Sequence, residues 1–214
     1  MKYLPDRSIL WALAAGVVLA LSFPRPDLSP LAWIGLVPLL LVMHRRPFAT
    51  GFAAGVGFFS LVLYWLNIVM TTYGQMHPIF SVVAYLLLVG YLALFFAVAT
   101  WTACQLQARR ALPLLLTLPV VWVGLEFLRS FLLSGFPWAL LGYSQQNREV
   151  LLQSADLFGV YGLSFLIVLV NVALADLLRW LRHRQGGAPW LGAAVAAGLI
   201  AATAGYGLVR LGGD

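Results

Sequence analysis

The chain has 214 residues, of which 62% are hydrophobic and only 9% are charged. Soluble domains carry about 25% charged residues, so the charged side chains here are too few to cover a surface that faces water. The composition therefore excludes a soluble globular protein and indicates an integral membrane protein. The apolar runs are long and continuous rather than alternating, which argues against a transmembrane β-barrel.

The net charge of +6 agrees in sign with nucleic-acid binding. The basic residues, however, lie in short clusters between apolar runs, which is the pattern of membrane topology. We therefore expect no nucleic-acid partner. The single cysteine, Cys104, excludes an internal disulfide.

The first apolar run, Ile9 to Phe23, follows Lys2 and Arg7 and has the charge pattern of a signal peptide. It ends in Ser-Phe-Pro-Arg-Pro at residues 22–26, without a small-x-small cleavage site. The sequence therefore predicts an uncleaved first helix.

The length of the apolar runs predicts an all-α integral membrane protein, a bundle of about seven transmembrane helices, because a helix needs about 20 apolar residues to cross a bilayer. We expect one transmembrane domain over residues 1–214. The first two spans are short and joined by the proline-rich turn 24–30, so a tight hairpin and a partly re-entrant segment both fit. The predicted spans are Ser8–Phe23, Leu28–Met43, Phe48–Met70, Ile79–Gln105, Leu112–Leu133, Phe158–Trp180 and Ala188–Val209.

The charged residues between the spans predict the orientation of the bundle. Most Lys and Arg residues fall on one side of this topology, which the positive-inside rule assigns to the cytoplasm. We expect a cytoplasmic N-terminus and an external C-terminus, as an odd number of spans requires. The residues on the cytoplasmic side are Lys2, Arg7, Arg45, Arg46, Arg109, Arg110, Arg179, Arg182 and Arg184, whereas Arg25, Arg129, Arg148 and Arg210 lie on or near the other side.

Small residues at helical spacing predict close packing between helices. Gly51 and Gly55 are four residues apart in the third span, and the same spacing recurs at Ala194, Gly198 and Ala202 in the last one. In lipid, small residues let two helix backbones approach closely. The polar residues expected to form hydrogen bonds between helices are Asn67 and Asn171.

Residues Ser134 to Leu157 form the one long predicted segment outside the membrane, called the outer loop below. Aromatic, glycine and polar residues are frequent in it, and Trp and Tyr prefer the membrane interface. An ordinary connection and a contact with lipid or a partner both fit this composition. The candidate substrate-binding residues are Phe136, Trp138 and Tyr143.

Glu126 and Arg129 lie three residues apart, on one face of the fifth span. Charge inside a membrane segment is costly, so such a pair is a functional hypothesis by default. We expect Arg129 to extend outward to the interface, with Glu126 about one turn deeper. One interpretation is a structural ion pair that holds the helix end to the outer loop, and the other is a site for a lipid headgroup. Asp176 and Arg179 repeat this spacing in the sixth span.

Other common catalytic patterns are absent from the sequence. His44, His77 and His183 are not spaced as metal ligands, so we expect no metal ion and no cofactor. Ser144 and Asp156 do not lie in the context of a hydrolase triad, since the Gly-x-Ser-x-Gly motif is missing. Cys104 has no neighbouring acid or histidine to activate it.

Several motifs together resemble the membrane domain of apolipoprotein N-acyltransferase, the last enzyme of bacterial lipoprotein maturation. Three of them are Glu-Phe-Leu-Arg-Ser at residues 126–130, Gly-Phe-Pro-Trp at 135–138 and Gly-Tyr-Ser-Gln at 142–145. The other matching segments follow in the same order over most of the chain: Leu21–Pro24, Leu31–Pro38, Gly51–Phe58, Tyr64–Trp65 and Phe158–Phe165.

The resemblance implies an acyltransferase of the bacterial cytoplasmic (inner) membrane, with a periplasmic C-terminus. Members of the family transfer an acyl chain from a phospholipid to the N-terminal diacylglyceryl cysteine of lipoproteins. They use a nitrilase-like domain with a Glu-Lys-Cys triad, which follows the seventh span. The implied partners are therefore phospholipid, diacylglyceryl lipoprotein and that catalytic domain, in the same chain or a separate one.

The sequence departs from this family pattern at the triad. Its one lysine, Lys2, and its one cysteine, Cys104, both fall on the predicted cytoplasmic side. We expect no catalytic residue in this chain and no acyltransferase activity from it alone, since the reaction needs a positioned nucleophile with a base. The expected role is to bind lipid substrates and position the catalytic domain. The alternatives are a noncatalytic lipid-binding or scaffolding protein of the same fold and, more remotely, a transporter.

Overall fold

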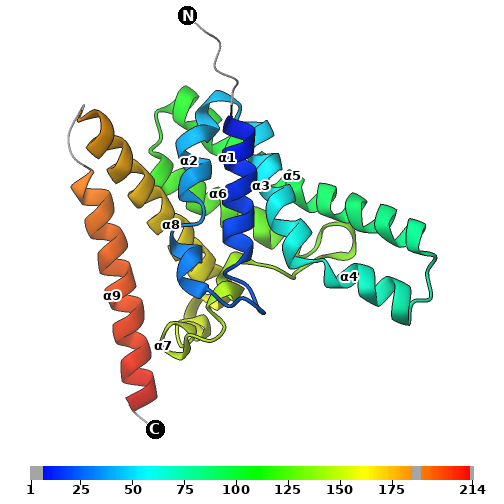
Figure 1. Ribbon diagram of the computed structural model, residues 1–214. Coiled ribbons are helices and arrows are strands. Elements are labelled where there is room, and N and C mark those ends of the chain that lie inside the picture. Colours follow the sequence, from blue (N-terminus) through cyan, green and yellow to red (C-terminus); the bar gives the residue numbers. More distant parts are fainter. Residues whose placement is uncertain (1–6, 185–188, 213–214) are drawn as a thin grey trace, which may run out of the picture.

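The computed structural model describes residues 7–184 and 189–212, and in that part every regular element is helical. This confirms the predicted all-α class. Figure 1 shows a bundle built from the first eight helices, with α9 along one side. The helices are α1 (Ser8–Ala20), α2 (Val37–Val42), α3 (Pro47–Val62), α4 (Trp65–Ile68), α5 (Pro78–Arg110), α6 (Leu114–Arg129), α7 (Glu149–Leu152), α8 (Ala155–His183) and α9 (Trp190–Gly212).

Short helical segments join these helices. Turns of 3₁₀ helix precede α2, follow it, lead into the outer loop and occur within that loop, and a π-helical turn follows α4. Prolines explain several starts, because a proline at the first turn loses no intrahelical hydrogen bond. The short segments are η1 (Ser29–Trp33), η2 (Met43–Arg45), η3 (Val69–Tyr73), η4 (Leu132–Ser134) and η5 (Leu141–Gln145).

The predicted count of seven spans is not confirmed. Within the described residues, α5, α8 and α9 are long and apolar enough to cross a membrane, and α3 with α4–η3 makes a fourth if this pair, bent by 49°, is one span. The first predicted span corresponds to α1, which has only 13 residues. The predicted span Leu112–Leu133 is α-helical only over the 16 residues of α6, and its last two residues belong to the 3₁₀ turn η4. Lys2, Ala188 and Asp214 lie outside the described residues.

The second predicted span, Leu28–Met43, is broken into η1 and the six-residue α2. Asn171 of α8 supports this break: its Oδ1 accepts from the Leu36 N–H at 2.9 Å, and its Nδ2 donates to the Ala32 carbonyl at 2.8 Å. Backbone groups at membrane depth need such partners, because the hydrocarbon offers none. The predicted interhelical role of Asn171 is confirmed, and it keeps a non-helical turn buried in the bundle.

The centre of the bundle is the packing of α3 against α1 and α5. A side chain at Gly51 would meet Thr100 and the Phe96 carbonyl of α5, and one at Gly55 would lie within 2.7 Å of the Ala93 backbone. These contacts confirm the close approach predicted from the Gly51–Gly55 spacing. Phe58, Phe59 and Phe96 form an aromatic cluster there, with ring centroids 4.9 to 5.5 Å apart.

The packing predicted for the last span is wrong at Gly198, where an added side chain would meet nothing within 4 Å. The close approach of α9 occurs instead at Gly207, where an added side chain would collide with the carbonyl of Val150 in α7. The reason is that α9 lies along the outside of the bundle (Figure 1), and Ala196 and Gly207 are its only buried residues.

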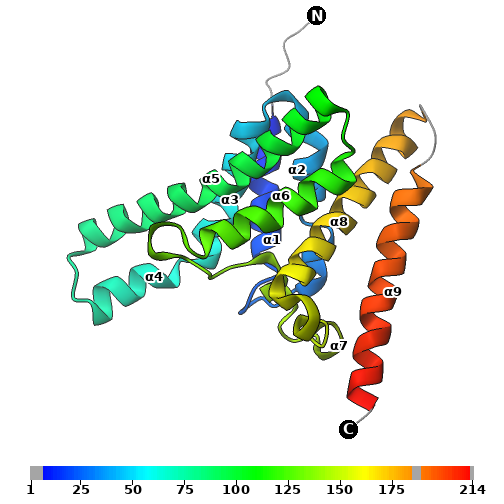
Figure 2. The same ribbon diagram turned by 180° about the vertical axis from the view of Figure 1, so that it is seen from behind.

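The N-terminal half of α5 projects away from the bundle beside α4, as both views show (Figures 1 and 2). Asn67 joins the two helices, because the Ser81 hydroxyl donates to its side-chain oxygen and to its backbone carbonyl. This confirms the predicted interhelical role of Asn67.

Candidate functional site

The main cavity at the outer-loop end of the bundle has a volume of about 610 Å³. Its walls come from three segments far apart in the sequence: the turn after α1, the junction of α3 and α4, and the outer loop. We call it the outer pocket. Ligand pockets commonly have about 300 to 1,000 Å³, so this one is large enough for part of a lipid.

Two of the three candidate residues from the sequence line the outer pocket. Trp138 and Tyr143 are on its wall and are 53% and 42% exposed. Phe136 is not among the lining residues; it packs against the hydrophobic core, with its ring centroid 5.2 Å from that of Trp138. Phe136 therefore supports Trp138 from behind rather than forming the wall, and a contact of Trp138 and Tyr143 with substrate stays a prediction.

Hydrogen bonds fix the outer loop to the turn before α2. The buried Gln145 accepts from Trp33 Nε1 at 3.2 Å and donates to the Ser29 carbonyl at 3.1 Å. Arg148 Nε donates to the Ser29 hydroxyl at 2.8 Å. Gly142 N–H donates to the Ser164 hydroxyl at 2.8 Å. The bonds of Gln145 and Arg148 join residues more than a hundred positions apart, and together with the bond between Gly142 and Ser164 they give the pocket a defined wall.

Glu126 and Arg129 lie beneath this loop and are 7% and 2% exposed. Glu126 Oε1 accepts from the backbone N–H of Leu141 at 2.8 Å. Arg129 Nη2 donates to the carbonyls of Trp138 and Ala139 at 3.2 and 3.3 Å. The expected outward extension of Arg129 is wrong, because residues 138–139 cover its guanidinium and supply the acceptors that it would otherwise find in water.

The two charges hold the loop separately. Among the described residues, the ion pairs within 4.0 Å are Arg179–Asp176 and Arg210–Asp156, so Glu126 and Arg129 do not form a direct contact pair. A cavity of about 20 Å³ adjoins both side chains, and neither Glu126 Oε2 nor Arg129 Nε has a hydrogen-bond partner. That volume is enough for about one water molecule. That Glu126 and Arg129 brace the helix end against the outer loop stays a prediction, and their hydrogen bonds to residues 138–141 support it.

A second cavity, of about 590 Å³, lies between α6, α8 and α9 and is called the α8–α9 pocket. Its lining is mostly apolar, and the side chains in it that carry a hydroxyl group are Ser154, Tyr161, Thr203 and Tyr206. The Tyr206 hydroxyl donates to Asp156 Oδ2 at 2.7 Å, and Arg210 lies 3.4 Å from the same oxygen. The pocket is therefore apolar along its length and polar near the end of α9.

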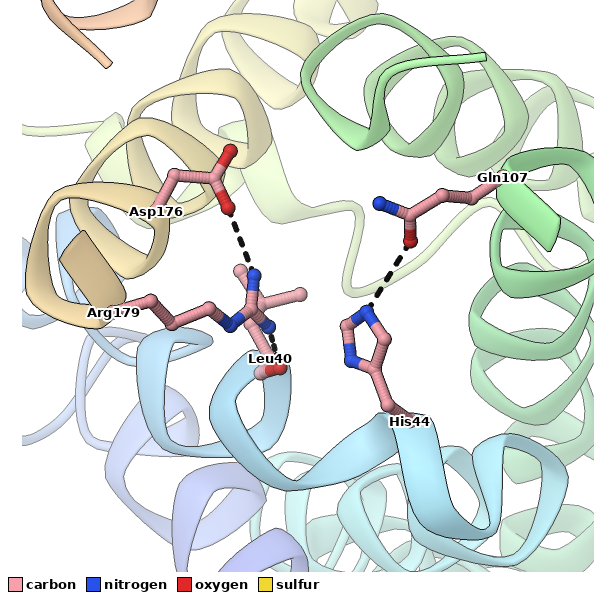
Figure 3. Close-up of polar contacts among 5 residues, drawn as sticks. All are labelled: Leu40, His44, Gln107, Asp176 and Arg179. Carbon is pink, nitrogen blue, oxygen red and sulfur yellow. Dashed lines mark hydrogen bonds and ion pairs between the residues drawn. The ribbon is translucent and has the colours of Figure 1, made fainter. Parts of the chain in front are cut away.

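A polar cluster joins three helices at the opposite end of the bundle (Figure 3). Arg179 donates to Asp176 Oδ1 at 2.8 Å and to the carbonyl of Leu40 at the end of α2. His44 Nε2 lies 3.2 Å from Gln107 Oε1 of α5. Partial burial, together with the charge of Arg179, lowers the pKa of His44, which lies in η2 between α2 and α3. The contacts fasten α2 to α8 and η2 to α5, and they confirm the predicted Asp176–Arg179 pair.

The side chains that a triad would need are engaged in different places. Ser144 is buried and donates to the Leu141 carbonyl at 2.7 Å, whereas Asp156 faces α9. His77 caps the N-terminus of α5 on the projecting arm, where its Nδ1 accepts from Ile79 N–H. In the described part of the chain, no group of three or more His, Cys, Asp or Glu residues is placed to hold a metal ion.

Reasoning from the sequence missed Arg25, Tyr64 and Gln146, which also line the outer pocket. Arg25 lies apart from the cytoplasmic clusters of basic residues, and the Tyr64–Trp65 pair lies at the junction of α3 and α4, as interfacial aromatic residues often lie near helix ends. The sequence therefore contained one signal for Arg25 and one for Tyr64. The sequence gives no sign, however, that residues 24–26 meet residues 138–146.

Comparison with known proteins gives a consistent result. The model of a family described as the apolipoprotein N-acyltransferase N-terminal domain matches residues 15–173. An apolipoprotein N-acyltransferase of Geobacter metallireducens is 45% identical over 213 residues, 97% of this chain and 41% of that protein. Those of Nitrosomonas europaea and Rhodopirellula baltica are 34% and 35% identical over 86% and 92% of this chain. The chain thus spans 36 to 41% of the length of these relatives.

Proposed function

The chain belongs to the apolipoprotein N-acyltransferase family and corresponds to its N-terminal domain, and from this premise we propose that it binds the acyl chains of lipid substrates beside a catalytic domain. The reaction would transfer an acyl chain from a phospholipid to the diacylglyceryl cysteine of a lipoprotein. This chain would supply the lipid sites, and a nitrilase-like domain would supply the nucleophile.

The observation that carries this proposal is the outer pocket. Its walls are mostly apolar, and Tyr64, Trp65, Trp138 and Tyr143 lie around it. Aromatic residues with a polar edge gather where the acyl region of a bilayer meets its headgroups. A pocket with such a rim suits an acyl chain that enters from the membrane and a headgroup that stays near water.

The α8–α9 pocket supports a second lipid contact. It matches the outer pocket in size, at about 590 against 610 Å³, and its lining is similarly apolar. A reaction with two lipid substrates needs a place for each of them. We assign the phospholipid to the outer pocket, because the outer loop that forms its wall also carries the Gly-Phe-Pro-Trp and Gly-Tyr-Ser-Gln motifs.

The proposed arrangement places the domain in the bacterial inner membrane, with the outer loop and the end of α9 on the periplasmic side. Most cationic side chains then lie at the end that holds His44 and Gln107, in agreement with the positive-inside rule. The single transmembrane domain and about seven crossings belong to this proposal. In it, α1, the η1–α2 segment and α6 cross as shorter helices, since tilt and local thinning adapt a bilayer to short spans.

Lipid retention tests the proposal. The chain is reconstituted in phospholipid nanodiscs, released into the gas phase, and analysed by native mass spectrometry for bound phospholipid. We expect the native chain to retain phospholipid and the double variant Trp138→Ala, Tyr143→Ala to retain several-fold less. The control is Trp11→Ala, since Trp11 is 59% exposed on α1 and does not line the pocket.

Equal retention by all three proteins would contradict the proposal. A full-length family member carrying the same two substitutions gives the second readout. If that protein lost bound lipid and yet transferred acyl chains at the native rate, the noncatalytic scaffold would be the better interpretation.

A further inference from the structure

Arg25 is the one charged side chain among the described residues that line the outer pocket. It is exposed and follows α1, where the chain turns toward η1. Gln146 and Tyr143, which carry an amide and a hydroxyl group, lie on the same wall. The polar groups of the pocket can therefore meet a single anionic group, whereas the remaining wall is apolar.

The guanidinium of Arg25 is held by an aromatic ring rather than by a carboxylate. It lies over the ring of Tyr64, 5.3 Å from the centroid. In the described part of the chain, the ion pairs are Arg179–Asp176 and Arg210–Asp156, so Arg25 takes part in none. The nearest acid in the sequence, Asp27, accepts from Asn147 Nδ2 at 2.8 Å. A guanidinium over an aromatic face still has its N–H donors in its own plane, where they can bind the oxygens of a phosphate two at a time.

The backbone of Arg25 lies in a region that favours glycine, with φ at 93°. Residues other than glycine rarely adopt such a value, and Pro26 restricts the preceding residue further. Strained residues of this kind persist where the surroundings hold them, and they often occur at ligand sites. An arginine at this position therefore carries a conformational cost that a glycine would avoid.

We propose that Arg25 binds the phosphate of a phospholipid whose acyl chain lies in the outer pocket, an inference that rests on the proposed function above. The Arg25 guanidinium donates to the phosphate oxygens. Gln146 and the Tyr143 hydroxyl bound the headgroup, and Trp138 and Leu63 contact the chain below it. This arrangement selects lipids that carry a phosphate over neutral lipids with the same chains.

The occupant is a lipid rather than a free anion because of the shape and chemistry of the wall. An inorganic phosphate would leave most of the 610 Å³ unfilled and the apolar lining without a partner. A phospholipid places its charge and its chain in the two parts of the pocket that match them. Burial of each CH₂ group then adds to the affinity, whereas the phosphate contact adds selectivity.

The test compares two lipids with identical acyl chains, phosphatidylglycerol and diacylglycerol, which lacks the phosphate. Native mass spectrometry of the chain from nanodiscs that contain both gives the ratio of the two retained lipids. We expect the native chain to prefer phosphatidylglycerol by about tenfold or more, which corresponds to about 1.4 kcal/mol. Arg25→Gln should abolish the preference, and Arg25→Lys should keep part of it.

Arg25→Gly separates binding from folding, because glycine adopts the observed φ without strain. It should lose the preference and resist unfolding at least as well as the native chain. The matched control is Arg109→Gln, which removes an exposed cation at the end of α5, lines neither pocket and should keep the native ratio. A native preference that survives in both Arg25→Gln and Arg25→Gly would overturn the role of Arg25. If the native chain retains neither phosphatidylglycerol nor diacylglycerol, the proposed function itself is refuted.

Discussion

Replacement of Glu126 separates its charge from its hydrogen bonds. Glu126→Ala removes the acceptor of two buried donors, the Leu141 N–H at 2.8 Å and Trp122 Nε1 at 3.1 Å. Glu126→Gln keeps an amide oxygen for both donors. Because both variants lose the carboxylate charge beside Arg129, the difference between them reports the two hydrogen bonds.

The magnitude follows from the cost of leaving these donors unpaired. A buried unsatisfied donor costs about 1 to 3 kcal/mol, so two cost about 2 to 6 kcal/mol. Polar contacts in membrane proteins average about 0.6 kcal/mol each, which sets a lower limit of about 1 kcal/mol. We therefore expect Glu126→Ala to lower the free energy of unfolding by about 1 to 6 kcal/mol more than Glu126→Gln does.

Unfolding in mixed micelles of increasing dodecyl sulfate measures the free energy, and hydrogen exchange reports the Leu141 amide. That amide should exchange faster in Glu126→Ala and stay protected in Glu126→Gln. The contrary result would be free energies of unfolding that agree within about 0.5 kcal/mol in the two variants, the range of ordinary surface substitutions, together with unchanged exchange at Leu141. That result would show that Glu126 does not hold the loop.

Three further predictions concern helix packing and pH. Gly207→Ala should detach α9 from α7 and lower the thermal midpoint of unfolding, because the new methyl group meets the Val150 carbonyl. Gly205→Ala in the same helix meets nothing within 4 Å and should be neutral or slightly stabilising. Equal thermal midpoints for the two variants would contradict the docking of α9 on α7. Asn171→Ala should destabilise by about 1 to 3 kcal/mol, because the buried N–H of Leu36 loses its acceptor, and a change below about 0.3 kcal/mol in chemical unfolding would argue against that role. Because the folded protein lowers the pKa of His44, the stability that neutral His44 allows is fully present above its ordinary pKa of 6.5 and is lost as the pH falls through the pKa of the folded state. His44→Gln should therefore make the thermal midpoint depend less on pH. An unchanged slope of midpoint against pH would rule out His44 as the source of that dependence.

Periodic and compositional features made the main elements of the fold predictable. The long apolar runs gave α5, α8 and α9, and the small-residue spacing at Gly51 and Gly55 gave the packing of α3 on α5. Such features are local, so a sequence displays them directly. The break at residues 34–36 depended on Asn171, which is 135 residues from Leu36, and no local pattern announces that contact.

The site was predictable only in part, for the same reason. Trp138 and Tyr143 stood out because interfacial aromatic residues gather in one segment. Arg25 became part of the pocket through tertiary contacts, in which the outer loop folds back on residues 27–33. The spacing of Glu126 and Arg129 indicated a shared helix face correctly, but the loop that each side chain binds enters the bundle from further along the chain.

Photo-crosslinking with a phospholipid that carries a diazirine near the end of one acyl chain tests the central claim, that the outer pocket holds a phospholipid. In nanodiscs, we expect labels on the pocket wall at residues 61–65 and 138–146, and an excess of unlabelled phospholipid should suppress them. Labels confined to outward-facing positions such as Leu191 and Val209 of α9, 79% and 75% exposed, with no suppression by competitor, would contradict the claim.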